Sequence, residues 1–137
     1  MPKKAKIENY TYAVGRRKSA VATVKLFEKS GESQVNKMAL AKFFPGESAK
    51  IRYGLPFKAL EVVDKFHFQA KVLGGGKIGQ LDALVLAISR ALQKISPTAN
   101  TPILRSNDLL TVDSRVRQRR MVGKGGKSRR QKQSPKR

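Results

Sequence analysis

The sequence lacks the residues on which several classes of protein depend. It has no cysteine and one histidine, which excludes zinc fingers, zinc knuckles, disulfide staples and thiol chemistry. It has only nine acidic residues against 30 lysines and arginines, so the formal net charge is +21 on 137 residues. A chain of this charge repels itself unless a polyanion neutralises it. We therefore expect a protein that works while bound to a nucleic acid.

Long apolar runs are also missing. No stretch approaches the roughly 20 apolar residues that a membrane-spanning helix needs. No helical pattern sets a cleanly basic face against a large apolar one, as membrane-surface helices do. Residues 1–9 hold charges without the hydrophobic core of a signal peptide, so we expect a cytoplasmic protein and no membrane partner.

Positive charge is most concentrated at the C-terminal end. From Ser114 to Arg137 there are eleven lysines and arginines and no acidic residue, and the only sizeable apolar side chains are Val116, Met121 and Val122. Such a segment buries too little hydrocarbon to offset the entropy of ordering it, so we expect an extended tail that is ordered only by a partner. A phosphate backbone suits these cations because binding releases its counterions. A merely solvated tail is the alternative.

The hydrophobic pattern predicts three strands in the remaining residues. Residues 10–27 have strand character, and Ala20, Ala22, Val24 and Leu26 share one face of the predicted strand. Residues 33–38 are expected to return beside it as a hairpin, through a polar loop that contains a glycine. Residues 66–73 alternate again, with the single histidine, His67, on the outer face, solvated or facing RNA rather than acting as a general base.

Helices are predicted before and after this third strand in the sequence. Short helical pieces are expected at 39–44, 48–52 and 56–60. Apolar residues at helical spacing from Leu81 to Ile95 predict the main helix, and Thr101 as N-cap opens a short last one. Helices packed on one face of a sheet give a two-layer α/β architecture of the α+β type. The predicted organisation is a lead at 1–9, a globular domain at 10–113 and a tail at 114–137.

One glycine-rich segment matches the dinucleotide-binding fingerprint. Gly74-x-Gly76-x-x-Gly79 follows a predicted strand and leads into a helix. However, no buried strand follows that helix, and Asp108 comes too late to hold a ribose. The glycines are explained by a tight turn before the helix, or by exposed helix amides that receive an RNA phosphate.

A second segment resembles the end of a P-loop. Gly126-Lys127-Ser128 has the right residues, but Met121 stands where the motif requires its first glycine. No hydrophobic strand precedes this segment and no helical pattern follows it. We expect no cofactor, no metal, no small-molecule substrate and no enzymatic activity.

Four motifs resemble one known family. Residues 12–22, Tyr-Ala-Val-Gly-Arg-Arg-Lys-Ser-Ala-Val-Ala, closely resemble the "GxGRRKxSxARV" opening of the ninth protein of the small ribosomal subunit in its bacterial form. The other three follow in the family's order. They are Gly74-Gly75-Gly76 with Gly79-Gln80 and Arg90-Ala91-Leu92, then Asp113-Ser114-Arg115, then Lys136-Arg137. The resemblance covers roughly residues 10–137.

This resemblance implies a fold, a location and a set of partners. The fold is a two-layer domain with a mixed sheet and a left-handed βαβ crossover. The partners are small-subunit ribosomal RNA of the 16S type and neighbouring proteins of the subunit head, in a cytoplasmic or organellar ribosome. The family's tail reaches the tRNA in the peptidyl site.

The family's contacts are carried over by motif. Those to rRNA fall on Arg16, Arg17, Lys18, Gly74, Gly75, Gly76, Lys77, Arg115, Arg117, Arg119 and Arg120, and those to tRNA on Lys136 and Arg137. Independently of the family, three adjacent cations in a strand-forming run suit a phosphate surface.

The chain departs from the family pattern at two places. Val85-Leu86 stands where the family commonly has arginine and histidine in the long helix, so a basic contact is absent there. Gln133-Ser134-Pro135 stands where an aromatic residue is common near the end of the tail. A stacking contact on RNA is therefore not expected from this part of the tail.

Overall fold

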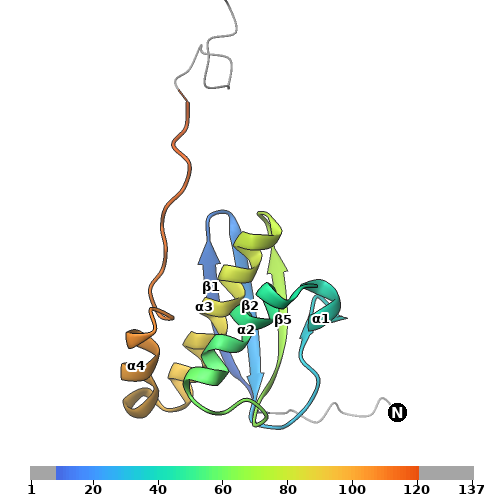
Figure 1. Cartoon of the computed structure of the whole chain (residues 1–137), viewed down its shortest axis with the longest axis vertical. Coiled ribbons are helices and arrows are strands. Elements are labelled where there is room, and N and C mark those ends of the chain that lie inside the picture. The colour runs from blue at the N-terminus through green and yellow to red at the C-terminus, as the bar shows by residue number, and fades with distance from the viewer. Residues whose placement is uncertain (1–8, 121–137) are drawn as a thin grey trace, which may run out of the picture.

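The computed structural model describes residues 9–120, in which helices cover one face of a five-stranded sheet (Figure 1). The sheet has the order β1-β2-β5-β3-β4. It is mixed, because β3 runs parallel to β5 while the other neighbours are antiparallel. The strands are β1 (Thr11–Arg17), β2 (Ala20–Phe27), β3 (Gln34–Val35), β4 (Met38–Ala39) and β5 (His67–Leu73). The predicted α/β class is confirmed.

Four helices accompany the sheet. They are α1 (Leu40–Phe43), α2 (Glu47–Ala59), α3 (Lys77–Ile95) and α4 (Pro97–Ser106). The predicted apolar stripe of α3 is buried, with Leu84 and Ile88 fully covered by the sheet and the neighbouring helices. Because this stripe supplies the inner layer of the core, α3 is the element on which the rest of the domain packs.

The sheet contributes its inner face to the same core. Ala20, Ala22, Val24 and Leu26 are all fully buried, which confirms the predicted alternation in β2. The two layers approach each other closely at Gly15 of β1. A Cβ atom there would lie 2.1 Å from the carbonyl oxygen of Ala83 in α3. The glycine of the Gly15-Arg16-Arg17 motif is therefore needed for packing.

Two predictions about the strands were wrong: residues 10–27 are not one strand, and residues 33–38 do not pair with the second half of that segment. Residues 10–27 form a hairpin of two strands, which turns at Lys18 with φ of 53°. Residues 33–38 do not return beside β2, because β5 occupies that place and pairs with β2 along its length. A pattern of alternation reports which residues face the core, but it does not report which distant strand is the neighbour.

Some helix boundaries also differ from the prediction. The pieces expected at 48–52 and 56–60 are one helix, α2, with Pro56 inside it. Packing of Phe57 on Phe68 of β5, with ring centroids 6.3 Å apart, holds the end of this helix in spite of the proline. The last helix begins at Pro97 with Ser96 as N-cap, rather than at Thr101, because proline is well suited to a first helical turn.

The connection between the parallel strands β3 and β5 crosses the helical face through α2. In Figure 1, β5 points upward, β3 and β4 lie to its right, and α2 passes in front of the sheet. A crossover that moves leftward in front of upward strands is left-handed, as the family resemblance implies. It is the rarer hand for such a unit.

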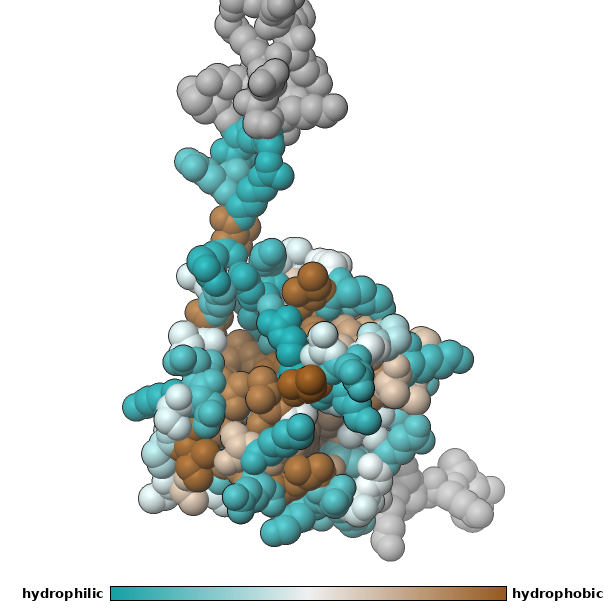
Figure 2. All heavy atoms as spheres, viewed as in Figure 1, coloured by the Kyte–Doolittle hydropathy of each residue, from teal (hydrophilic) through white to brown (hydrophobic). Residues whose placement is uncertain are grey.

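Residues 107–120 contain no helix or strand and leave the domain as an extension (Figure 1). Figure 2 shows that this extension is mostly hydrophilic, while apolar side chains gather on the domain below it. No helix among residues 9–120 is long and apolar enough to cross a membrane.

Candidate nucleic-acid interface

Three of the predicted RNA-binding segments meet at one end of the domain. They are the β1–β2 turn, the glycine loop at 74–76 and the start of α3, which share the upper end in Figure 1. The glycine loop packs directly on the turn: a Cβ on Gly74 would lie 2.5 Å from the carbonyl oxygen of Ser19, and one on Gly75 would lie 3.1 Å from Cβ of Ala20. Segments about 55 residues apart in sequence therefore form one surface.

The glycine loop makes a tight turn and leaves the helix end open. Gly74 and Gly75 have φ of 73° and 65°, in the left-handed region that favours glycine. Gly76 is the N-cap of α3, no side chain caps the helix, and no described atom lies within 4 Å of a Cβ built on Gly76. The first amides of α3 and the positive end of its dipole are therefore accessible to an anion.

The three adjacent cations of the turn point in different directions. Arg16 and Lys18 are exposed, whereas the side chain of Arg17 is only 15% exposed. Successive residues of a strand face opposite sides of the sheet, so Arg16 lies on the helix-free face and Arg17 on the face of α3. Only two of the three cations are thus free to meet an outside phosphate.

Arg17 holds the start of the extension on the domain. Its guanidinium lies 3.1 Å from the carboxylate of Asp113 and 3.7 Å from that of Asp82 in α3, and it donates a hydrogen bond of 2.8 Å to the carbonyl oxygen of Arg115. We call Arg17, Asp82, Asp113 and Arg115 the extension clamp. Asp82 also pairs with Arg52 of α2 at 2.9 Å, so the clamp is fixed to two helices.

Asp113 and Arg115 form the outer part of the extension clamp. The Arg115 guanidinium donates to both carboxylate oxygens of Asp113, at 2.9 and 2.7 Å, and its backbone N–H donates at 3.0 Å. These hydrogen bonds, and to a smaller degree the charge of Arg17, hold the pKa of Asp113 well below its ordinary value. The same pair raises the pKa of Arg115. The Arg115 side chain is 84% exposed, so it also faces solvent.

The other predicted RNA contacts are arranged along the extension and beside α1. Arg117 and Arg119 are exposed and Arg120 is half-buried. The ammonium of Lys77 lies 3.7 Å from the centroid of the Phe43 ring, a cation–π contact that fixes its position at the start of α3. Lys136 and Arg137 lie outside the described residues, as does most of the predicted tail.

Sequence reasoning missed several contacts of α3. Besides Asp82, these include Arg90 and Lys94, which donate to the carbonyl oxygens of Val14 and Tyr12 at 2.8 and 2.7 Å and so cover the outer edge of β1. His67 is on the outer face as predicted, but its ring stacks on Phe27 with centroids 4.9 Å apart. The motifs contained Arg17, Asp113 and Arg115 but did not show that they contact one another, and Asp82 had no sequence signal.

These features together define a class of protein. It is a small basic α/β domain in which a glycine turn, an open helix end and an arginine-rich extension face the same side, as suits a phosphate backbone. The family model described as Ribosomal protein S9/S16 matches residues 15–137. The chain belongs to this family, so the predicted family is confirmed. Membership in a family of ribosomal proteins also agrees with the prediction that the chain is not an enzyme.

Several similar proteins share one name, small ribosomal subunit protein uS9. The chain is 40% identical over 116 residues to the small ribosomal subunit protein uS9 of Porphyromonas gingivalis, which covers 85% of this chain and 90% of the relative. It is 38% identical over 120 residues to the uS9 protein of Desulfotalea psychrophila, with 88% and 92% covered. The uS9 protein of Leifsonia xyli is 42% identical over 111 residues, which are 81% of this chain but 66% of that longer relative.

Proposed function

We propose that the chain is a structural, RNA-binding constituent of the small ribosomal subunit. In this role, the domain at 10–113 binds 16S-type ribosomal RNA in the subunit head, next to other ribosomal proteins. The tail at 114–137 runs along RNA toward the peptidyl site. The observation that carries the proposal is the extension clamp, because it aligns an arginine-rich, acid-free segment with the glycine loop and the open end of α3.

The geometry supports a specific chemistry for each proposed contact. Arg16, Lys18 and the arginines at 117, 119 and 120 supply charge for phosphates, and planar guanidinium groups bind phosphate in a bidentate manner. The amides of Gly76 and Lys77 supply uncharged donors at the helix end. Arg17 positions the extension. Arg115 helps to position it and also exposes its guanidinium to a phosphate.

The sedimentation of the full chain with small subunits tests the rRNA role. In a sucrose gradient at moderate salt, the wild-type chain should travel with small subunits. Replacing Arg16 and Lys18 with glutamine should weaken binding and flatten its salt dependence, because each lost phosphate contact removes counterion release. The matched control replaces Lys42 and Lys50, which are exposed on the helical side. A chain that leaves the subunits and binds many duplexes would instead be a free architectural protein.

The tRNA role rests on Lys136 and Arg137. They follow Asp113 by more than 20 residues, and an extended chain spans roughly 3.3 Å per residue, so they can act several tens of ångströms from the clamp. Replacing both with glutamine should leave subunit assembly intact and lower peptidyl-site tRNA affinity by about 1–2 kcal/mol. Filter binding of tRNA to reconstituted subunits measures this change. Unchanged affinity in normally assembled subunits would refute the tRNA role.

A further inference from the structure

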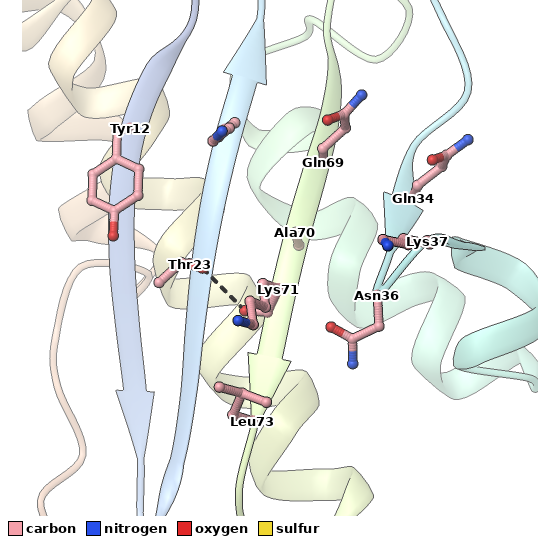
Figure 3. Close-up of a pocket in the computed structure, with 10 residues that line it drawn as sticks. Tyr12, Thr23, Gln34, Asn36, Lys37, Gln69, Ala70, Lys71 and Leu73 are labelled. Carbon is pink, nitrogen blue, oxygen red and sulfur yellow. Dashed lines mark hydrogen bonds between the residues drawn. The ribbon is translucent and has the colours of Figure 1, made fainter.

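The sheet has a second face, which no described helix covers. Alternation places Tyr12, Thr23, Lys25, Gln69 and Lys71 on this face, opposite the core. The strand register brings them side by side, since Tyr12 pairs with Lys25, Lys25 with Gln69, and Thr23 with Lys71. All five line an open hollow of about 580 Å³. Figure 3 labels four of them, Tyr12, Thr23, Gln69 and Lys71, on the exposed side of the strands. We call this surface the open sheet face.

The charge of the open sheet face has one sign. Lys25, Lys37 and Lys71 line the hollow, and no carboxylate is among the described residues that line it. Between the lysines lie the amides of Gln34 and Gln69, which can both donate and accept hydrogen bonds. A surface with cations and amides but no acid is suited to a polyanion rather than to an ordinary protein surface.

The same face offers an aromatic ring and an apolar contact. Tyr12 is 48% exposed although it lies within β1, and Leu73 at the end of β5 is 58% exposed. An exposed aromatic side chain on a sheet, flanked by lysines, is the arrangement on which unpaired bases stack while their phosphates contact cations. Packing in the core does not explain the exposed Tyr12, whereas stacking of an unpaired base on its ring does.

The edge of the open sheet face is rigid. Asn36 and Lys37 form the two-residue turn between β3 and β4, both with positive φ, as a type I′ hairpin requires. The side chain of Asn36 donates to the carbonyl oxygen of Val72 at 3.0 Å and accepts from its N–H at 2.9 Å. Lys37 is thus presented to the hollow from a turn that is bonded to β5.

We propose that the open sheet face binds a second segment of ribosomal RNA, separate from the segment at the clamp. Phosphates contact Lys25, Lys37 and Lys71, and an unpaired base stacks on Tyr12. This inference rests on the proposed rRNA role. Arg16, which pairs across β1–β2 with Val21 on the same face, connects the two surfaces. The domain would then contact two RNA segments, one at the end of the sheet that carries the glycine loop and one on the open sheet face.

Tethered hydroxyl-radical probing tests this placement directly. The chain has no natural cysteine, so one cysteine at the exposed Gln34 carries an iron chelate at the rim of the hollow. In assembled small subunits, this probe should cut one or two short rRNA segments. The control probe at Ser48, exposed at the start of α2, should not cut these segments. The absence of rRNA cleavage from position 34, or cross-links to a protein there, would overturn the inference.

Charge variants separate this inference from the proposed function. Replacing Lys25 and Lys71 with glutamine should lower affinity for 16S-type rRNA about tenfold. It should also reduce the slope of log affinity against log salt concentration by about two, because two phosphate contacts are lost. The double change Lys50→Gln with Lys58→Gln, on the helical side, is the matched control. Tyr12→Ala should also weaken binding, and Tyr12→Phe should restore it. If the Lys25/Lys71 variant binds like its control, the open sheet face is not an RNA site. If the wild-type chain does not bind, the proposed function itself fails.

Discussion

The globular domain and the extension are held in place by different forces. The domain depends on apolar burial, with fully covered side chains from β2, β5 and α3 in one cluster. Beyond Leu110 the extension has almost no buried apolar side chain, and its described contacts with the domain are ionic and polar ones at the clamp. We expect burial to keep the domain folded without RNA, whereas a few charged groups determine only where the extension begins.

The two faces of the sheet differ in a similar way. The inner face carries alanine, valine and leucine that contact α3, while the open sheet face carries lysine, glutamine and tyrosine. A single alternating strand pattern thus provides both the folding surface and a surface for a partner. Changes on the inner face should alter stability, and changes on the outer face or in the extension should alter RNA binding.

The largest effect should follow from a change inside the domain. Gly15→Ala places a Cβ 2.1 Å from Ala83 O and 2.6 Å from Ala87 N, which are backbone atoms of α3. β1 must move away from the helix, so we expect a loss of about 3 kcal/mol in the free energy of unfolding, measured by urea denaturation. Gly54→Ala in α2 is the control, because apart from its own helix backbone and chain neighbours the only described atom within 4 Å of its Cβ is Cε of the flexible Lys58 side chain, and it should stabilise by about 0.5–1 kcal/mol. A stable Gly15→Ala variant would refute the packing role of this glycine.

A large effect on binding, without one on stability, should follow from neutralising the extension. Replacing Arg117, Arg119 and Arg120 with glutamine should reduce the slope of log affinity against log salt by about two to three. The urea midpoint should not change, because these side chains are outside the core cluster. The control variant replaces three exposed lysines of the helical side, Lys42, Lys50 and Lys58. An equal loss in this control would mean that net charge, rather than the position of the arginines, determines binding.

A more local effect should follow from opening the clamp. In Asp113→Asn, Arg17 and Arg115 lose their shared carboxylate, so the amides of residues 114–118 should become more mobile in NMR relaxation measurements. The amides of β2 and α3 should keep their wild-type values. Asp108→Asn, a nearby change of the same charge outside the clamp, should leave 114–118 unaltered. Equal mobility in wild type and Asp113→Asn would show that the clamp does not order the extension.

The smallest expected effect is that of pH. In the folded chain the pKa of Asp113 lies below its ordinary value of 3.8, so the ionised carboxylate stabilises the clamp at every pH above 3.8. This stabilisation is lost as pH falls through the lowered pKa of the folded chain. NMR relaxation of residues 114–118 should therefore be constant between pH 5 and pH 8 and change only below about pH 4. A transition near neutral pH would assign the control of the extension to another group.

Local patterns predicted much of this fold, and distant contacts were the part they missed. The apolar stripe of α3 and the alternation in β2 and β5 depend on neighbouring residues, so their faces were predicted correctly. The two-residue strands β3 and β4 are too short to show a period, and the parallel pairing of β3 with β5 joins residues 35 positions apart. Such pairing is decided by tertiary packing.

The same distinction applies to the candidate site. The motifs identified the cations of the turn and of the extension, and the glycine loop, as surface for RNA. They did not reveal that Arg17 faces inward, because its partner Asp113 is 96 positions away in the sequence. The open sheet face was also missed, since its residues come from separate strands whose register was unknown.

The affinity of the Asp113→Asn variant for 16S-type rRNA is the most direct test of the account. Simple electrostatics predicts tighter binding, because the variant removes a negative charge from a surface that meets phosphates. Our account predicts weaker binding at constant salt, because the carboxylate orients the extension through Arg17 and Arg115. Asp108→Asn serves as the charge-matched control. Weaker binding of Asp113→Asn alone would support the clamp, and binding as tight as or tighter than wild type would contradict it.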